Sequence, residues 1–167
     1  MVKGKYDLDR ELKKWLKHVD RIVIAGIGNP LRMDDFVGVK IAQDLKGKVS
    51  DRVMLIECET VPESYIQQIL NFDPTHLLLM DAAILGLKPG EAKLVNPEQL
   101  IGSSAFSTHL LPLRIFCEYL KKESKISIAL LLIEPKKTDF GEGLELEISA
   151  SASKITENLS KILSEKA

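Results

Sequence analysis

The chain has 167 residues, of which 45% are apolar, so it is the size of one domain that buries its own core without disulfides. Its 23 basic and 24 acidic residues give a formal net charge of −1, and this near-balance argues against an electrostatic nucleic-acid binder. No apolar run approaches the roughly 20 residues of a membrane span, and the first residues lack the apolar segment of a secretory signal. Two cysteines, Cys58 and Cys117, are too few for a disulfide framework and form no CxxC pair. We therefore expect a single cytoplasmic domain over residues 1–167, without membrane insertion or a nucleic-acid partner.

The first predicted element is an amphipathic helix within residues 1–20, where apolar side chains recur at helical spacing opposite a row of lysines. From residue 21 onward, short β-rich runs alternate with helical patterns. Strands are predicted at 21–27, 53–58, 76–80, 91–95 and 126–133, and helices at 36–45, 62–72, 108–120 and 144–163. The strand from residue 91 follows the Pro89-Gly90 turn and is predicted at a sheet edge. This alternation predicts an α/β fold with a mostly parallel sheet covered on both faces by helices.

Ligands of open α/β sheets bind at the carboxyl ends of the strands. Three segments at such positions carry candidate side chains: residues 29–35 after the first strand, residues 81–83 after the third, and the turn into the helix at His109. Because these segments belong to one predicted sheet, we expect them at the same edge.

Two carboxylates and one imidazole are the candidate ligands at this edge. Asp34 and Asp35 begin a helix, so we expect Asp34 to cap it and Asp35 to be available for other work. Asp81 ends an apolar strand, where a carboxylate either caps a turn or pairs with a cation. His109 falls in the first turn of its helix, where the dipole favours a neutral ring with a lone pair, although a purely structural role is the alternative. Together they form an incomplete coordination shell and predict a metal site with open positions.

Several ordered segments of the chain resemble the [NiFe]-hydrogenase maturation endopeptidases, in particular the hydrogenase 3 (HycI-like) group. The resemblance runs from about Ile22 to the end, and the segments that carry it are Gly26-Ile27-Gly28-Asn29-Pro30-Leu31 with Asp34-Asp35, Asp81-Ala82-Ala83 with Gly86 and Pro89-Gly90-Glu91, Ser107-Thr108-His109 with Leu113, Glu134-Pro135-Lys136, and Asp139-Phe140-Gly141.

The resemblance implies a three-layer sandwich of the phosphorylase/hydrolase-like type, with a twisted sheet of about five strands between helices. It also implies an endopeptidase that removes the C-terminal extension of a [NiFe]-hydrogenase large-subunit precursor after nickel insertion. The nickel is expected to come with the substrate, and other divalent metals are able to occupy the site. The protein itself is expected to be a monomer or a weak homo-oligomer.

The residue roles that the resemblance implies fall on the positions that the loop argument selects. Asp35, Asp81 and His109 are expected to contact the metal and to be catalytic, with Asp34 as an accessory base. Substrate binding is expected at Gly28, Asn29, Pro30 and Thr108. One departure lies at Phe36, where the family usually has glycine; a position that required positive φ would be strained by phenylalanine.

The catalytic step is left open by the sequence. The metal either polarises the scissile carbonyl or activates a water molecule, and a role in docking alone is also compatible. Neither a Ser-His-Asp order nor a Cys-His spacing is present, and Cys117 is predicted in the core.

Three other functions compete with this assignment. A dinucleotide-binding module is disfavoured because Leu31 stands where its third glycine belongs and because Asp34 and Asp35 would repel a pyrophosphate. Peptidyl-tRNA hydrolase shares the Gly26–Pro30 opening but needs a tyrosine soon after it and a His-Asn pair, and neither follows here; the charge balance also lacks the basic face expected for tRNA. A metal-sensing chaperone that docks on the precursor without cleaving it is the non-enzymatic alternative.

Overall fold

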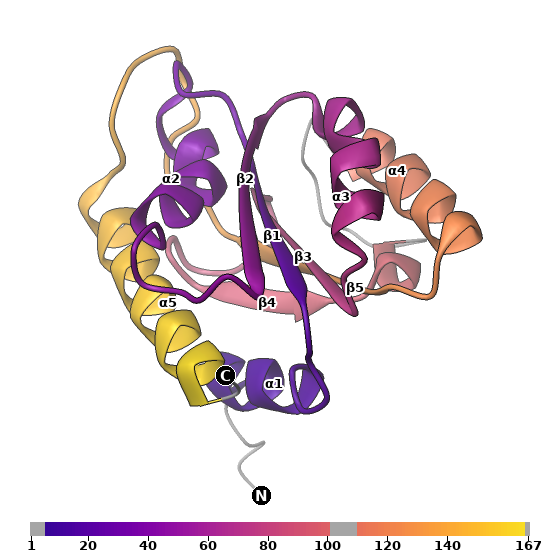
Figure 1. The fold of residues 1–167 in the computed structure, drawn as a ribbon. Coiled ribbons are helices and arrows are strands. Elements are labelled where there is room, and N and C mark those ends of the chain that lie inside the picture. The colour runs from indigo at the N-terminus through magenta and orange to yellow at the C-terminus, as the bar shows by residue number, and fades with distance from the viewer. Residues whose placement is uncertain (1–5, 101–109, 166–167) are drawn as a thin grey trace, which may run out of the picture.

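A five-stranded sheet forms the centre of the molecule (Figure 1). The computed structural model describes residues 6–100 and 110–165. The strands follow the order β2-β1-β3-β5-β4, in which β4 alone is antiparallel, to β5. Their bounds are β1 Ile22–Ile27, β2 Val53–Glu59, β3 His76–Ala82, β4 Ala92–Val95 and β5 Ser127–Ile133.

Helices cover both faces of the sheet, as Figure 1 shows. On one face lie α1 (Leu8–Trp15), α2 (Val37–Asp44) and α5 (Leu146–Glu165), and on the other lie α3 (Ile66–Phe72) and α4 (Leu110–Glu123). Short 3-10 turns, η1 (Met33–Phe36), η2 (Pro62–Tyr65) and η3 (Pro97–Leu100), precede α2, α3 and α4. The expected three-layer α/β sandwich with a mostly parallel sheet of five strands is confirmed.

Two apolar cores fill the space between the layers because strand side chains alternate between the faces. Ile22 and Ile24 of β1 join the core under α1, α2 and α5, whereas Val23, Ala25 and Ile27 join the core under α3 and α4. Every residue of β1 and β3 is buried. The apolar sequences of β1 and of residues 77–80 in β3 thus follow from burial on both faces.

The N-terminal helix α1 packs across the amino ends of the parallel strands. Leu12 in this helix and Leu16, which directly follows it, face the core and are fully buried. The Trp15 indole donates to the Ser127 hydroxyl at the start of β5 (3.0 Å), and His76 at the start of β3 lies 3.1 Å from the Trp15 carbonyl. Since candidate residues lie at the opposite ends of these strands, α1 has the packing role that the sequence predicts.

The element boundaries differ from the sequence predictions at two positions that matter for the site. The strand β3 continues through Asp81 to Ala82, so Asp81 is paired with β5 near the end of the strand and does not lie in a loop. The helix predicted from residue 36 is preceded by η1, which contains both Asp34 and Asp35. In the described part of the chain, no helix is long and apolar enough to cross a membrane.

Candidate active site

Three glycines allow the start of α2 to lie directly on the backbone of the central strands. A Cβ atom on Gly26 would come within 2.4 Å of the Gly38 carbonyl oxygen, and one on Gly38 within 2.1 Å of the Met80 carbonyl oxygen. A Cβ on Gly28, whose φ is +145°, would come within 1.8 Å of the Asp35 carbonyl oxygen. Only glycine permits such backbone contacts. The spacing Gly26-x-Gly28 therefore serves helix packing against the sheet.

This packing brings the segments that carry Asp35 and Asp81 to one corner of the sheet. Gly38 of α2 touches the backbone of Met80, the residue before Asp81, and η1 contacts β3. Asp35 is 5% exposed and Asp81 is fully buried. Two of the three predicted metal-contacting residues thus lie at the carboxyl edge of adjacent strands, where the sequence places them.

Asp35 closes the loop that follows β1. Its Oδ2 accepts from the backbone N–H of Asn29 (2.8 Å), and the Asn29 side chain accepts from the N–H of Leu31 (2.9 Å). Among the described residues, the Asn29 N–H is the only donor to the Asp35 carboxylate, so Oδ1 remains able to accept a hydrogen bond from another partner. This bond holds Asn29, which is predicted to bind substrate, against Asp35, which is predicted to contact the metal.

Asp34 has a different role from the one expected. The prediction that it caps its own helix is wrong, because its carboxylate accepts from distant backbone amides: Lys136 (2.9 Å) and Lys137 (2.8 Å) to Oδ2, and Glu145 (2.8 Å) to Oδ1. The side chain is fully buried. A carboxylate that stabilises three amides of one loop is poorly placed to exchange protons with substrate, which argues against Asp34 as an accessory base.

The Asp81 carboxylate contacts the backbone at the end of its own strand. Its Oδ1 accepts from the backbone N–H of Ala82 (2.9 Å), and it has a further interaction in the structure. The loop after β3 is fixed by a second buried carboxylate, Glu134, whose Oε1 accepts from the N–H groups of Leu85 (2.7 Å) and Leu87 (2.9 Å). No role is predicted for the Glu134 side chain, although its position directly after an apolar strand repeats the pattern of Asp81.

A β-bulge shapes the other side of the loop after β1. The pairing of β1 with β2 shifts between Gly26, opposite Glu57, and Ile27, opposite Glu59. Glu59 has a left-handed φ of 52°, and its carbonyl accepts from the N–H of Gly28 (2.7 Å). Bulges and left-handed residues of this kind often border functional sites because they redirect the chain. Nothing in the sequence marks this bulge.

The remaining predicted residues divide into those that the structure describes and those that it does not. His109 and Thr108 lie outside the described residues, and α4 is described from Leu110. Within residues 6–100 and 110–165 no group of three His, Cys, Asp or Glu side chains could hold a metal ion. The predicted three-ligand shell, with His109 as its third member, therefore stays a prediction.

Phe36 is accommodated without backbone strain. Its φ of −79° and ψ of −7° fall in the right-handed region that any residue adopts. The nearby residue with positive φ is Met33, at 44°. The strain considered at Phe36 is therefore absent.

Neither cysteine is suited to be a nucleophile. Cys58 and Cys117 are both free and buried, and burial raises the pKa of each thiol to about 12. Since the thiolate is the reactive form, both should be inert near neutral pH. This agrees with the core position predicted for Cys117.

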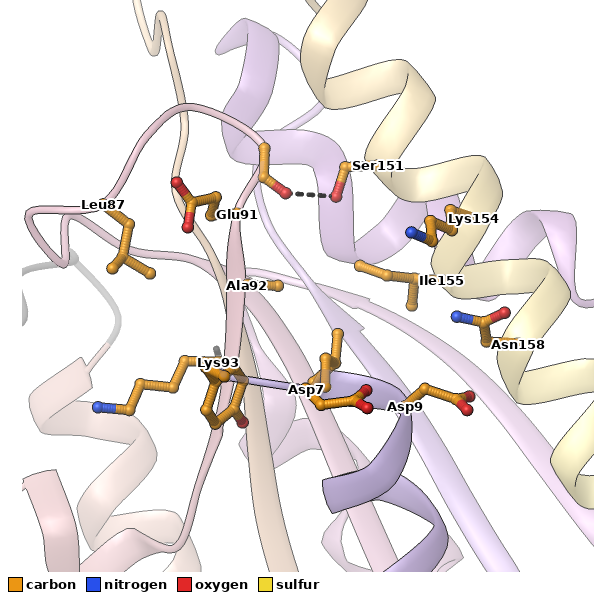
Figure 2. A pocket seen from close by; sticks show the side chains of 13 residues that line it. Asp7, Asp9, Leu87, Glu91, Ala92, Lys93, Ser151, Lys154, Ile155 and Asn158 are labelled. Carbon is orange, nitrogen blue, oxygen red and sulfur yellow. Dashed lines mark hydrogen bonds between the residues drawn. The ribbon is translucent and has the colours of Figure 1, made fainter. Parts of the chain in front are cut away.

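A cavity of about 610 Å³ lies away from the candidate carboxylates, between β4, α5 and the residues around the start of α1 (Figure 2). Glu91 and Lys93 come from the sheet side, and Ser151 on α5 donates to the Gly90 carbonyl (2.6 Å). Tyr6 occupies the strand edge, where its hydroxyl accepts from the N–H of Leu94 (2.8 Å). The lining holds none of the predicted site residues.

The geometry also weighs against a dinucleotide site. In that motif the second glycine lets a pyrophosphate approach the backbone. Here the space over Gly28 is filled by the Asp35 carbonyl and by the Cα of Phe36, 3.2 Å from a Cβ position. Two aspartates follow, so a phosphate would meet negative charge instead of free amides.

Comparison with known proteins gives one consistent result. Residues 39–165 match the sequence profile of the family described as hydrogenase maturation protease (HycI). A Methanocaldococcus jannaschii relative whose name places it among the hydrogenase maturation proteases is 35% identical over 158 residues, covering 90% of this chain and 92% of the relative. The hydrogenase 3 maturation protease of Escherichia coli K12 is 30% identical over 101 residues, covering 60% of this chain and 65% of its own.

A solved structure supports the same relationship. The crystal structure of a [NiFe] hydrogenase maturation protease HycI from Thermococcus kodakarensis superimposes with a TM-score of 0.86 at 35% identity. The superposition covers 92% of this chain and 99% of that one.

Proposed function

The chain belongs to the hydrogenase maturation protease family, and from this premise we propose that it is the endopeptidase that removes the C-terminal extension of a [NiFe]-hydrogenase large-subunit precursor once nickel has been inserted. The description of the Thermococcus relative as a [NiFe] hydrogenase maturation protease supports the substrate class. The proposed compartment is the cytoplasm, which agrees with two cysteines that remain free.

The observation that carries the proposal is the pair of buried carboxylates, Asp35 and Asp81, at the carboxyl edge of adjacent central strands. Two carboxylates this close to the core are costly unless a cation or donors compensate them. The Asp35 carboxylate accepts from the backbone N–H of Asn29, and the Asp81 carboxylate accepts from that of Ala82 and has a further interaction. Such oxygen donors suit a divalent ion, and an imidazole such as His109 would suit nickel as a third ligand.

In the proposed reaction, nickel arrives as part of the substrate. Asp35, Asp81 and His109 contact it, so that only a loaded precursor is held with its extension in the site. The ion then either polarises the scissile carbonyl or activates a water molecule. Gly28, Asn29, Pro30 and Thr108 would line the bound peptide. Other divalent metals could occupy the same ligands, and the protein is proposed to act as a monomer or weak homo-oligomer.

Mass spectrometry of a large-subunit precursor tests this proposal. The wild-type protein should shorten the nickel-loaded precursor by its C-terminal extension and leave the nickel-free precursor intact. Asp35→Asn and His109→Ala should each abolish cleavage. The asparagine keeps an oxygen able to accept from Asn29 but removes the charge that meets the metal. Asp51→Asn is the matched control, because Asp51 is exposed at the opposite end of β2.

Two results would reject parts of the proposal. Cleavage of nickel-free precursor at the same rate would remove nickel sensing. A stable complex of the wild-type protein with loaded precursor whose extension stays intact would instead identify a docking chaperone.

A further inference from the structure

Three large apolar side chains are exposed on the segments around Asp34: one on the loop after β1, one on the loop between β5 and α5, and one at the first residue of α5. Phe140 is 86% exposed, Leu146 is 84% exposed and Leu31 is 46% exposed. We call these three residues the apolar rim. A single exposed apolar residue needs no explanation, but several on connected segments often mark a binding surface. The rim includes Phe140 of the Asp139-Phe140-Gly141 segment, which lies outside the candidate active site.

The two loops of the apolar rim are joined by backbone hydrogen bonds. The N–H of Gly141 donates to the Leu31 carbonyl (2.8 Å), and the N–H of Met33 donates to the Gly141 carbonyl (3.1 Å). The Arg32 side chain also donates to the Thr138 carbonyl (3.2 Å). Figure 1 shows the orange loop between β5 and α5 beside the loop that follows β1.

The buried Asp34 side chain holds the loop between β5 and α5 in place. Its carboxylate accepts from the amides of Lys136, Lys137 and Glu145, which flank Phe140 on both sides. The rim is therefore presented on a backbone that is already ordered. A preordered loop loses less conformational entropy when it binds, so exposed side chains on it contribute more to affinity.

Hydrogen bonds link the segments of the apolar rim to the loop that carries Asp35. Asp34 holds the rim, while its neighbour Asp35 holds Asn29 at the predicted substrate position. Leu31 belongs to the loop of Asn29 and bonds to the loop of Phe140. The rim and the candidate active site therefore share the loop that follows β1.

The charges beside the rim indicate the chemistry of a partner. Lys136 pairs with Glu147 (3.0 Å) and Lys137 with Glu145 (3.9 Å), so the basic residues of this loop are compensated. Asp139 and Glu142, on either side of Phe140-Gly141, are exposed and form no ion pair with any residue that the structure describes. The complementary surface is an apolar recess bordered by lysine or arginine.

We propose that the apolar rim is the docking surface for the folded body of the protein substrate, which seats Phe140 and Leu146 in an apolar recess with basic residues around it. The inference rests on the proposed function, since it names the surface by which the same precursor is held. The rim then supplies affinity, and the carboxylates act on the extension.

Steady-state cleavage of nickel-loaded precursor tests the docking surface. Phe140→Ser/Leu146→Ser should raise KM about tenfold or more, as expected when an anchoring aromatic is lost, with kcat within twofold of wild type. Asp139→Lys/Glu142→Lys should also raise KM and reduce its dependence on salt. The control is Ile115→Ser on α4, where the side chain is 59% exposed, and neither constant should change. All these side chains are exposed, so each variant should keep its melting temperature.

Each alternative outcome is distinguishable. An unchanged KM for the Phe140/Leu146 variant would overturn the docking surface while cleavage by the wild type upheld the proposed function. A wild-type dimer that this variant dissociates would identify the rim as a self-association surface and also overturn the inference. If the wild type binds but does not cleave, a tenfold weaker Kd of the variant for loaded precursor upholds docking although the proposed function fails.

Discussion

The contact between Gly38 and Met80 predicts that Gly38→Ala destabilises the protein although alanine is the better helix former. In an open helix, this change stabilises by roughly 0.5–1 kcal/mol. Here the new Cβ would lie 2.1 Å from the Met80 carbonyl oxygen and 2.9 Å from that of Ile27, and both are backbone atoms of buried strands. Overpacking of this kind costs roughly 1–3 kcal/mol, and more where the obstacle is backbone. We expect a net loss of about 2 kcal/mol or more, with α2 displaced from the sheet and Asp35 with it.

Thermal unfolding and cleavage measure the two consequences of that displacement. A loss of about 2 kcal/mol lowers the melting temperature by roughly 4–8 °C in a protein of this size. Gly47→Ala separates strain from collision, because Gly47 has a φ of +80° but no atom within 4 Å of its Cβ position. That control should cost about 1 kcal/mol and leave cleavage intact. A Gly38→Ala protein as stable as wild type, or equally active, would refute the close packing as the device that places Asp35.

Three further predictions follow from buried groups. Asp34→Asn should lower the free energy of unfolding by about 2–3 kcal/mol, because the amide has one acceptor oxygen for three N–H groups. Hydrogen exchange of the Lys136 amide should accelerate in this variant, and unchanged exchange would show that the Asp34 side chain does not hold the loop. Burial lowers the pKa of His76 from its ordinary 6.5, so its contribution to stability is present above pH 6.5 and is lost as pH falls through the folded-state pKa. Denaturant titrations at several pH values should therefore show that the free energy of unfolding depends less on pH in His76→Gln than in the wild type. Cys58 and Cys117 should resist alkylation at pH 8 until the protein is unfolded, and rapid labelling of native protein would contradict their burial.

The layers of the fold follow from periodicity because each strand and helix has a local signature. The apolar run of β3 indicates a strand buried on both faces, and the Pro89-Gly90 turn places β4 at an edge. The same reasoning brings Asp35 and Asp81 to one edge, since parallel strands end together.

Contacts between residues far apart in sequence are what the chain pattern does not reveal. Asp34 has the local appearance of a helix cap, yet its partners begin 102 positions away at Lys136. The fit of Gly38 against Met80 likewise depends on how closely a helix approaches a strand. Glu134 has a local signal after its strand, but the loop amides that it accepts from lie 47 and 49 positions away.

Nickel K-edge absorption of the loaded precursor, frozen rapidly after mixing with the protein, tests the central claim most directly. The spectrum should gain oxygen and imidazole-nitrogen neighbours from the protein, and His109→Ala should remove the imidazole contribution while Asp51→Asn does not. A nickel environment identical with and without the wild-type protein, measured while the extension is being cleaved, would contradict the claim that Asp35, Asp81 and His109 meet the metal.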